Sequence, residues 1–194
     1  MGLTAKTSGN GDFNIIPEGM HQAVCYGVYD LGTHYNERFG KNSHKVLIMW
    51  EVPDVPININ GVDLPSAISK RYTLSLHPKA TLTKDLESWR GKSFSTDELN
   101  GFDLEKLLGV NCMLQIIHNV TERGTYANIQ TIVPLYPAME KKEPVNSLQF
   151  YTFESDMDFP DDTPSWVSDI ILDAQEMKRE QPATVKTGQS TLEF

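Results

Sequence analysis

The sequence predicts a mainly β protein: a five-stranded Greek-key barrel with a helical insertion between its third and fourth strands, followed by an acidic C-terminal tail. Two central runs, residues 45–52 and 68–76, alternate their side chains at the two-residue period of β-strands. Residues 79–89 instead place apolar side chains at helical spacing. The charge is uneven, because residues 1–137 carry 12 basic and 14 acidic side chains whereas residues 138–194 carry 5 and 12.

The composition fits one soluble domain with an extension. The 194 residues, 39% hydrophobic and 22% charged, can form a domain of about 100–150 residues plus a tail. No apolar run approaches the roughly 20 residues of a membrane span, and residues 1–19 lack the apolar core of a signal peptide. We therefore expect a cytoplasmic protein without membrane contact. Cys25 and Cys112 lack CxxC spacing, so we expect both to be reduced core residues.

The first two strands follow a polar N-terminus. Residues 1–14 are polar and rich in glycine, which predicts a flexible lead-in to a barrel domain over residues 15–137. Residues 19–29 alternate weakly and predict the first strand, with Gly27 as a bulge or a close backbone approach. In the second strand, residues 45–52, one face is apolar throughout. The other face is apolar in its middle and charged at both ends, as expected of a surface that is covered part of the time.

The third strand and the first loop combine basic and aromatic side chains. Within residues 68–76, alternation points Lys70 and Arg71 to opposite faces beside Tyr72. Such a basic pair is typical of proteins that track a nucleic-acid backbone, and equally of ordinary amphipathic strands. The loop of residues 30–44 has no period but contains Tyr35, Arg38, Phe39 and Lys41. Loops often carry function, although these rings could also pack back onto the core.

The sequence period changes after the third strand. Leu82, Leu86 and Trp89 lie at positions i, i+4 and i+7, which predicts a helix over residues 79–89. A second short helix is predicted over residues 103–108, closed by a glycine. No nucleotide-binding βαβ unit is predicted, because this helical region lies between pairs of strands that look antiparallel.

The last two strands are predicted over residues 110–120 and 125–135, joined by a turn with Arg123 at its tip. Five strands with a helix between the third and fourth form the element order of the OB-fold. This fold binds oligonucleotides over strands two and three and over the loops that join strands one to two and four to five. Those places are here residues 45–52, 68–76, 30–44 and 119–125. The aromatic and basic candidates for contact there are Tyr35, Arg38, Phe39, Lys41, Lys45, Lys70, Arg71, Tyr72, Arg123 and Tyr126.

Two questions about these candidates stay open from the sequence. Tyr72 shares its parity with Leu74, so it also fits a core position. The parity of Arg71 favours the outer face of the barrel, but alternation does not decide which face would take a nucleic-acid strand.

The tail of residues 138–194 is acidic and aromatic. From residue 145 to residue 177 there is no Lys or Arg, against eight acids interleaved with five aromatic side chains. Residues 165–177 predict a short helix capped by Ser165, with Trp166, Ile170 and Ala174 along one face. We expect the tail to recruit partner proteins, and the candidate residues are Phe159, Asp161, Asp162, Trp166 and Phe194.

Several blocks in this order resemble the OB-fold single-stranded-DNA-binding proteins encoded by tailed bacteriophages. The similarity covers about residues 16–135 and is carried by Trp50-Glu51, by SKRYTLS at residues 69–75, by LESWRGK at residues 86–92 followed by Phe94, and by LLG at residues 107–109. The later PSWV at residues 164–167 is similar to that family's acidic tail element.

The resemblance implies non-catalytic, largely sequence-independent binding of single-stranded DNA in phage replication or recombination, in the cytoplasm of the host cell. It also implies that replication or recombination proteins are recruited through the acidic tail, and it implies no cofactor. Such tails commonly end in acids with an apolar tip, whereas the most acidic stretch of this chain is internal. The sequence therefore leaves open which segment recruits partners.

Two alternatives are kept. A small barrel could serve as a protein-interaction module that binds no DNA, since fold alone does not choose the function. A metal-dependent nuclease is disfavoured, because the sequence has no G-x-S-x-G, no H-E-x-x-H and no phosphate loop. The acids around Asp161 do not form a calcium loop, which needs glycine at that position. The sequence does not predict the site size or a preference for DNA or RNA. It also leaves the oligomeric state open, with a homo-oligomer as one of the alternatives.

Overall fold

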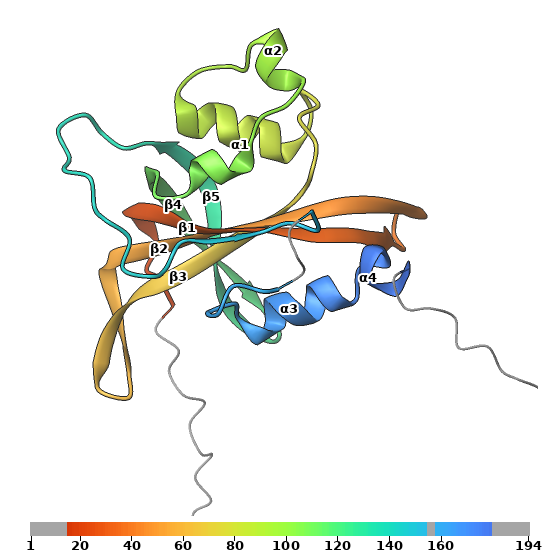
Figure 1. Cartoon of the computed structure of the whole chain (residues 1–194). Helices are drawn as coiled ribbons and strands as arrows, with labels where there is room; N and C mark the ends of the chain where they lie inside the picture. The colour runs from red at the N-terminus through yellow and green to blue at the C-terminus, as the bar shows by residue number, and fades with distance from the viewer. Residues whose placement is uncertain (1–14, 155–157, 180–194) are drawn as a thin grey trace, which may run out of the picture.

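The alternating runs form a sheet in the computed structural model, which describes residues 15–154 and 158–179. Five strands pair antiparallel in the order β3-β2-β1-β4-β5 (Figure 1). They are β1 (Gly19–Asn36), β2 (Lys41–Ile59), β3 (Val62–Thr73), β4 (Asn111–Thr121) and β5 (Gly124–Pro134). Residues of β3 also contact residues of β5, so the two ends of this order approach each other and the sheet curls. The predicted mainly β class is confirmed.

A sixth strand and four short helices complete the described chain, together with one 3-10 helix. The strand β6 (Gln149–Tyr151) pairs in parallel with β1. Between β3 and β4 lie α1 (Thr81–Arg90), α2 (Thr96–Leu99) and the 3-10 helix η1 (Leu104–Leu107); after β6 lie α3 (Ser165–Leu172) and α4 (Gln175–Arg179). The two predicted helices of the insertion are therefore present. The prediction missed α2, which Ser95 and Glu98 begin as a reciprocal capping box.

The barrel interior is one of two hydrophobic cores. Leu82, Leu86 and Trp89 of α1 are buried there against the inward faces of the strands. The rings of Trp50 and Trp89 lie 5.6 Å apart between centroids, which joins β2 to the helical insertion. The alternation of residues 45–52 and the helical spacing of residues 79–89 thus converge on one core.

The second core lies on the outer face of β1 and β2. Its sheet residues include Leu47 and Met49, and Tyr151, Val167 and Ile171 come from the C-terminal part of the chain. Figure 1 shows α3 and α4 on the side of the sheet opposite α1 and α2. The apolar middle of the second face of β2 is explained, because another part of the same chain covers it.

This packing corrects the prediction that a detachable tail begins at residue 138. We define the C-terminal cover as residues 145–154 and 158–179, which pack on the sheet through β6, α3 and α4. The buried Glu51 carboxylate fastens its start by accepting hydrogen bonds from the backbone N–H groups of Val145 and Asn146, at 2.7 and 2.9 Å. The side-chain amide of Asn146 donates a third bond at 2.6 Å. The burial of apolar side chains and the hydrogen-bonded Glu51 carboxylate therefore hold the C-terminal cover on the sheet, although its acidic composition had predicted a solvent-exposed tail.

The helix predicted over residues 165–177 is divided into α3 and α4. Pro164, not Ser165, occupies the N-cap position of α3, and no side chain caps the helix. Val167, Ile171 and Ala174 are the buried positions, so Trp166 lies on the outside, 43% exposed, rather than on a shared apolar face. Val167 and Ile171 take the places predicted for Trp166 and Ile170, one residue later, which puts Trp166 on the outside, whereas Ala174 is buried as predicted.

The β1–β2 hairpin extends further than alternation predicted. β1 continues to Asn36 and β2 begins at Lys41, so the predicted loop of residues 30–44 is mostly paired strand. A register shift between Asp30 and Gly32 breaks the two-residue period there and hides the strand from a periodicity search. A second shift follows Cys25, where the sequence predicted a bulge at Gly27, and this prediction is confirmed.

Candidate nucleic-acid interface

The register of β2 and β3 decides which basic side chains share a face. Arg71 pairs with Leu47, and Thr73 pairs with Lys45. Directly opposed residues of an antiparallel pair project to the same face. Lys45, Arg71 and Thr73 therefore lie on the outer face, where Leu47 contributes to the second core. The outward orientation predicted for Arg71 follows from this register.

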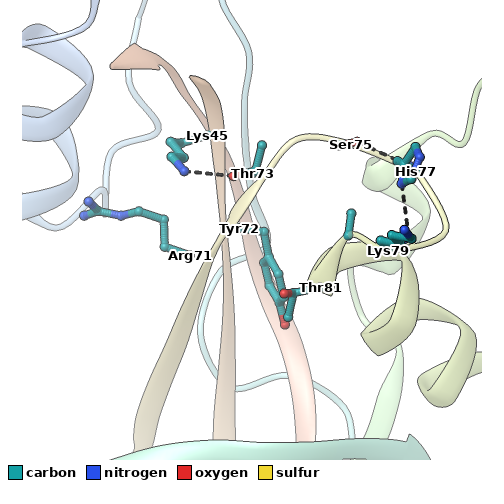
Figure 2. Close-up of a pocket in the computed structure, with 9 residues that line it drawn as sticks. Lys45, Arg71, Tyr72, Thr73, Ser75, His77, Lys79 and Thr81 are labelled. Atoms are coloured by element: carbon teal, nitrogen blue, oxygen red, sulfur yellow. Dashed lines mark hydrogen bonds between the residues drawn. The ribbon is translucent and has the colours of Figure 1, made fainter. Parts of the chain in front are cut away.

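Two adjoining hollows on this face form one groove. The larger, about 540 Å³, is lined by Lys45, Arg71, Tyr72, Thr73, Ser75, His77, Lys79, Ala80 and Thr81 (Figure 2). The smaller, about 370 Å³, is lined by Asn36, Phe39, Lys41, Asn42, Ser43, Lys45 and Thr73. Because Lys45 and Thr73 line both, we treat the hollows as one feature and name it the β2–β3 groove.

The β2–β3 groove is cationic. Its lining includes Lys41, Lys45, Arg71 and Lys79, and neither lining set includes an Asp or a Glu. The Nζ of Lys45 donates to the hydroxyl of Thr73 at 2.8 Å, which orients the amine along the groove. Within residues 15–154 and 158–179, none of the four cations forms an ion pair. Their charge is therefore uncompensated and available to an anion.

Exposed aromatic rings lie at one end of the groove. Phe39, which lines the smaller hollow, is 63% exposed, and Tyr35 on the same hairpin is 62% exposed. Tyr35 pairs with Asn42, another lining residue. The guanidinium of Arg38 lies 5.5 Å from the centroid of the Phe39 ring. Large exposed rings beside uncompensated cations can offer stacking surfaces next to phosphate contacts.

The structure does not support DNA contact by Lys70 and Tyr72, because Lys70 lines neither hollow and Tyr72 lines the larger one but is almost fully buried. The Nζ of Lys70 lies 2.7 Å from a carboxylate oxygen of Asp85, and the Tyr72 hydroxyl donates to the same oxygen at 2.9 Å. Tyr72 is only 3% exposed, and Figure 2 shows its ring pointing away from Arg71. Burial and the Asp85 carboxylate raise the pKa of the Tyr72 hydroxyl, which therefore stays a neutral donor. Alternation turns both side chains toward α1 and the barrel core.

Arg123 and Tyr126 lie elsewhere, in the turn between β4 and β5. They line a separate hollow together with Thr121 and Glu122, and this hollow shares no lining residue with the β2–β3 groove. The structure thus brings together four of the ten candidates along the groove, namely Phe39, Lys41, Lys45 and Arg71. Tyr35 and Arg38 lie on the same hairpin but line neither hollow.

The sequence analysis missed the far end of the groove. His77 and Lys79 lie in the segment that connects β3 to α1, where the sequence indicated only a strand end at His77-Pro78. A backbone N–H of Lys79 donates to Nδ1 of His77 at 3.2 Å, which folds this segment back toward the groove. The order Arg71, Thr73, Ser75, at a spacing of two, was the signal that could have traced the groove to this point.

The predicted partner-binding residues lie on the C-terminal cover and are only partly accessible. The Phe159 ring is 5.1 Å from that of Tyr151, so Phe159 packs against the second core. Asp161 and Asp162 are exposed, and so is Trp166. Phe194 lies outside the described residues.

Other chemistry is sparse in the described part of the chain. Residues 15–154 and 158–179 contain no group of three or more His, Cys, Asp or Glu side chains that could hold a metal ion. Cys25 and Cys112 are free and buried, as predicted, and burial raises the pKa of each thiol. None of the helices described here has the length and apolar character needed to cross a membrane.

Comparison with known proteins adds no relative to this geometry. No protein-family model matches the chain, and no curated protein or solved structure matches it either. The function is therefore argued from the groove.

Proposed function

We propose that this protein binds single-stranded DNA on an OB-fold barrel, without catalysis and largely without reading base sequence, in phage replication or recombination in the host-cell cytoplasm. The strand order β3-β2-β1-β4-β5, the contact between β3 and β5, and the position of α1 between β3 and β4 support this barrel.

The single observation that carries the proposal is the composition of the β2–β3 groove. Four uncompensated cations and no carboxylate line it, and exposed rings lie at one end. Cations pair with phosphates, which every nucleic acid has, but an exposed ring can stack only on a base whose face is free. A single strand offers such faces and a duplex does not. Because no carboxylate lines the groove, its cations are free to contact the phosphate backbone, which carries no sequence information.

The number of cations sets the expected salt dependence. Each phosphate contact on a single strand contributes a slope of about −0.7 to log K against log salt. Four contacts give a slope of about −3, so the affinity should fall about 50-fold between roughly 50 and 200 mM salt. The Arg71→Ala variant should bind more weakly to all sequences, with a slope smaller in magnitude by about 0.7.

The test is a titration of fluorescently labelled oligo-dT, followed by anisotropy at several salt concentrations, with a labelled duplex of equal length as competitor. Lys106→Ala is the matched control, because Lys106 is exposed and lines neither hollow. The proposal requires that Arg71→Ala lowers affinity while Lys106→Ala does not. A wild-type affinity that is independent of salt, or preference for the duplex, would contradict it.

A second role on the same chain is recruitment of replication or recombination proteins. The exposed Trp166 on α3 near Asp161 and Asp162 favours it, because an aromatic side chain among acids is a common contact for a basic partner surface. A protein-interaction module without DNA binding would use this surface alone, and such a protein would not bind oligo-dT. If recruitment accompanies DNA binding, Trp166→Ala should lower partner capture and leave oligo-dT binding unchanged.

A further inference from the structure

The hairpin that carries the exposed rings is attached to the C-terminal cover through Glu176 of α4. The Oε2 atom of Glu176 accepts a hydrogen bond from the backbone N–H of Thr33 at 2.8 Å, and its Oε1 atom accepts one from the Thr33 hydroxyl at 2.6 Å. Both carboxylate oxygens are thus used on one residue of β1. Thr33 lies two residues before Tyr35, so this contact is at the root of the hairpin tip.

One edge of β1 lacks a strand partner near this contact. β4 pairs with β1 over Gly19 to Val24, and β6 pairs with it over Gly27 to Tyr29. Beyond Tyr29, no strand in the described chain covers the edge of β1 that faces away from β2. The hydrogen bond from the Thr33 backbone N–H to Glu176 therefore satisfies a backbone donor on this free edge, and the bond from the Thr33 hydroxyl adds a second attachment.

Close packing seats α4 on this edge. Gly32 has a positive φ of 74°, and a Cβ added there would come within 2.6 Å of the Ala174 Cβ and 2.8 Å of the Glu176 Oε2 atom. Only glycine allows this approach. The neighbouring Gln175 donates from Nε2 to the side-chain oxygen of Asn42 at 2.8 Å. Because Asn42 lies on β2 and lines the smaller hollow, α4 holds both strands of the hairpin beside the groove.

We propose that Glu176 is a positioning residue of the β2–β3 groove, which fixes the β1–β2 hairpin so that Phe39 stands over the bound strand. The inference rests on the proposed function, and it assigns to α4 a role in DNA binding without DNA contact. It also predicts that removing the Glu176 carboxylate lowers the affinity for DNA, which is the opposite of the purely electrostatic effect. Removing a negative charge close to a cationic groove strengthens DNA binding if only electrostatics acts, whereas loss of positioning weakens it.

The test compares oligo-dT affinity for Glu176→Ala, Glu176→Gln and Thr33→Val with that of wild type, all in the full chain. Glu176→Ala should bind about tenfold more weakly, toward the low end of what one lost base stack costs. Glu176→Gln keeps one acceptor and should lose less, although it removes the same charge. Thr33→Val removes one hydrogen bond without a change of charge and should also weaken binding. The salt slope should stay near that of wild type, because all four cations remain.

Asp169→Asn is the matched control, since Asp169 is an exposed acid on α3 in the same cover. It should bind equally well or slightly better. If Glu176→Ala and Glu176→Gln both tighten binding as Asp169→Asn does, the inference is overturned. A loss that is equal for Glu176→Ala and Glu176→Gln, with no effect of Thr33→Val, would likewise overturn it.

Amide hydrogen exchange on the free protein separates this inference from the proposed function. Exchange over residues 33–41 should quicken in Glu176→Ala and in Thr33→Val, while the amides of β4 stay protected. If wild type fails to bind any single strand, the proposed function is wrong and no DNA role is left for Glu176. If wild type binds but exchange in the hairpin is unchanged in both variants, the positioning role alone is wrong. Thr33→Val carries the test if Glu176→Ala unfolds.

Discussion

Truncation of Ile171 tests whether the C-terminal cover contributes to the stability of the fold. Ile171 is fully buried in the second core, together with Leu47 and Tyr151. Truncating a fully buried isoleucine to alanine costs about 2–5 kcal/mol, because apolar burial is lost and a cavity remains. Taking about 3 kcal/mol, the melting temperature of a chain of this length should fall by about 6–12 °C. A detachable tail would show no change.

The assay for Ile171→Ala is urea unfolding followed by tryptophan fluorescence. Trp50 and Trp89 lie in the core inside the curled sheet, so in a Trp166→Phe background, which removes the tryptophan of α3, the signal reports the sheet and not α3 itself. Leu172→Ala is the matched control, because this neighbour is 51% exposed and should cost at most about 0.5 kcal/mol. The reasoning is refuted if the two variants unfold at the same urea concentration as wild type.

Two further predictions concern Tyr72 and acid. Tyr72→Phe keeps the buried ring but loses the hydrogen bond to Asp85, so stability should fall by about 1 kcal/mol in urea unfolding while oligo-dT affinity stays unchanged; a loss of affinity without loss of stability would return Tyr72 to the site. Burial opposes the ionisation of Glu176, but hydrogen bonds from the Thr33 side chain and backbone outweigh it and lower the pKa of this carboxyl below its ordinary value of 4.5. Because the folded pKa is the depressed one, the contribution of Glu176 is present above pH 4.5 and is lost as pH falls through the folded value. His44, which faces this carboxylate and pairs with Asp30, lies beside the same hairpin. The protection factors of the amides over residues 33–41 should fall below about pH 4.5 in wild type and much less in Glu176→Gln, which lacks the titrating group; an equal fall in both would exclude Glu176 as the cause.

The mainly β class and the helical insertion could be predicted because the strands and helices each have a local period. Alternation in residues 45–52 and helical spacing at Leu82, Leu86 and Trp89 were sufficient to place one core between them. The same alternation contained the answer for Lys70 and Tyr72, which share the parity of a core strand face. Their assignment to a binding site was based on residue type. The structure agrees instead with the alternation, which places both side chains on the core side of β3.

The C-terminal cover could not be predicted in this way, because its contacts join residues far apart in sequence. β6 has three residues, too few for a period, and it is held by pairing with β1 more than 120 positions earlier. The acids of α3 suggested solvent, while Val167 and Ile171 supplied burial that composition does not show. One signal was present: Leu47 and Met49 formed an apolar patch on the second face of β2 that required a cover.

The same cover defines where a strand could lie on the outer face. Arg71 pairs with Leu47, and Leu47 is buried beneath residues of β6 and α3. The border between the covered half of the face and the open groove is therefore one strand spacing, about 4.8 Å, wide. The described cover has no Lys or Arg from residue 145 to residue 177 but several exposed acids, and fields act over about 8–10 Å at physiological salt. A polyanion is thus repelled on one side of this border and attracted on the other. The net acidity of the chain then does not oppose the proposed function, because it would confine a bound strand to β2 and β3.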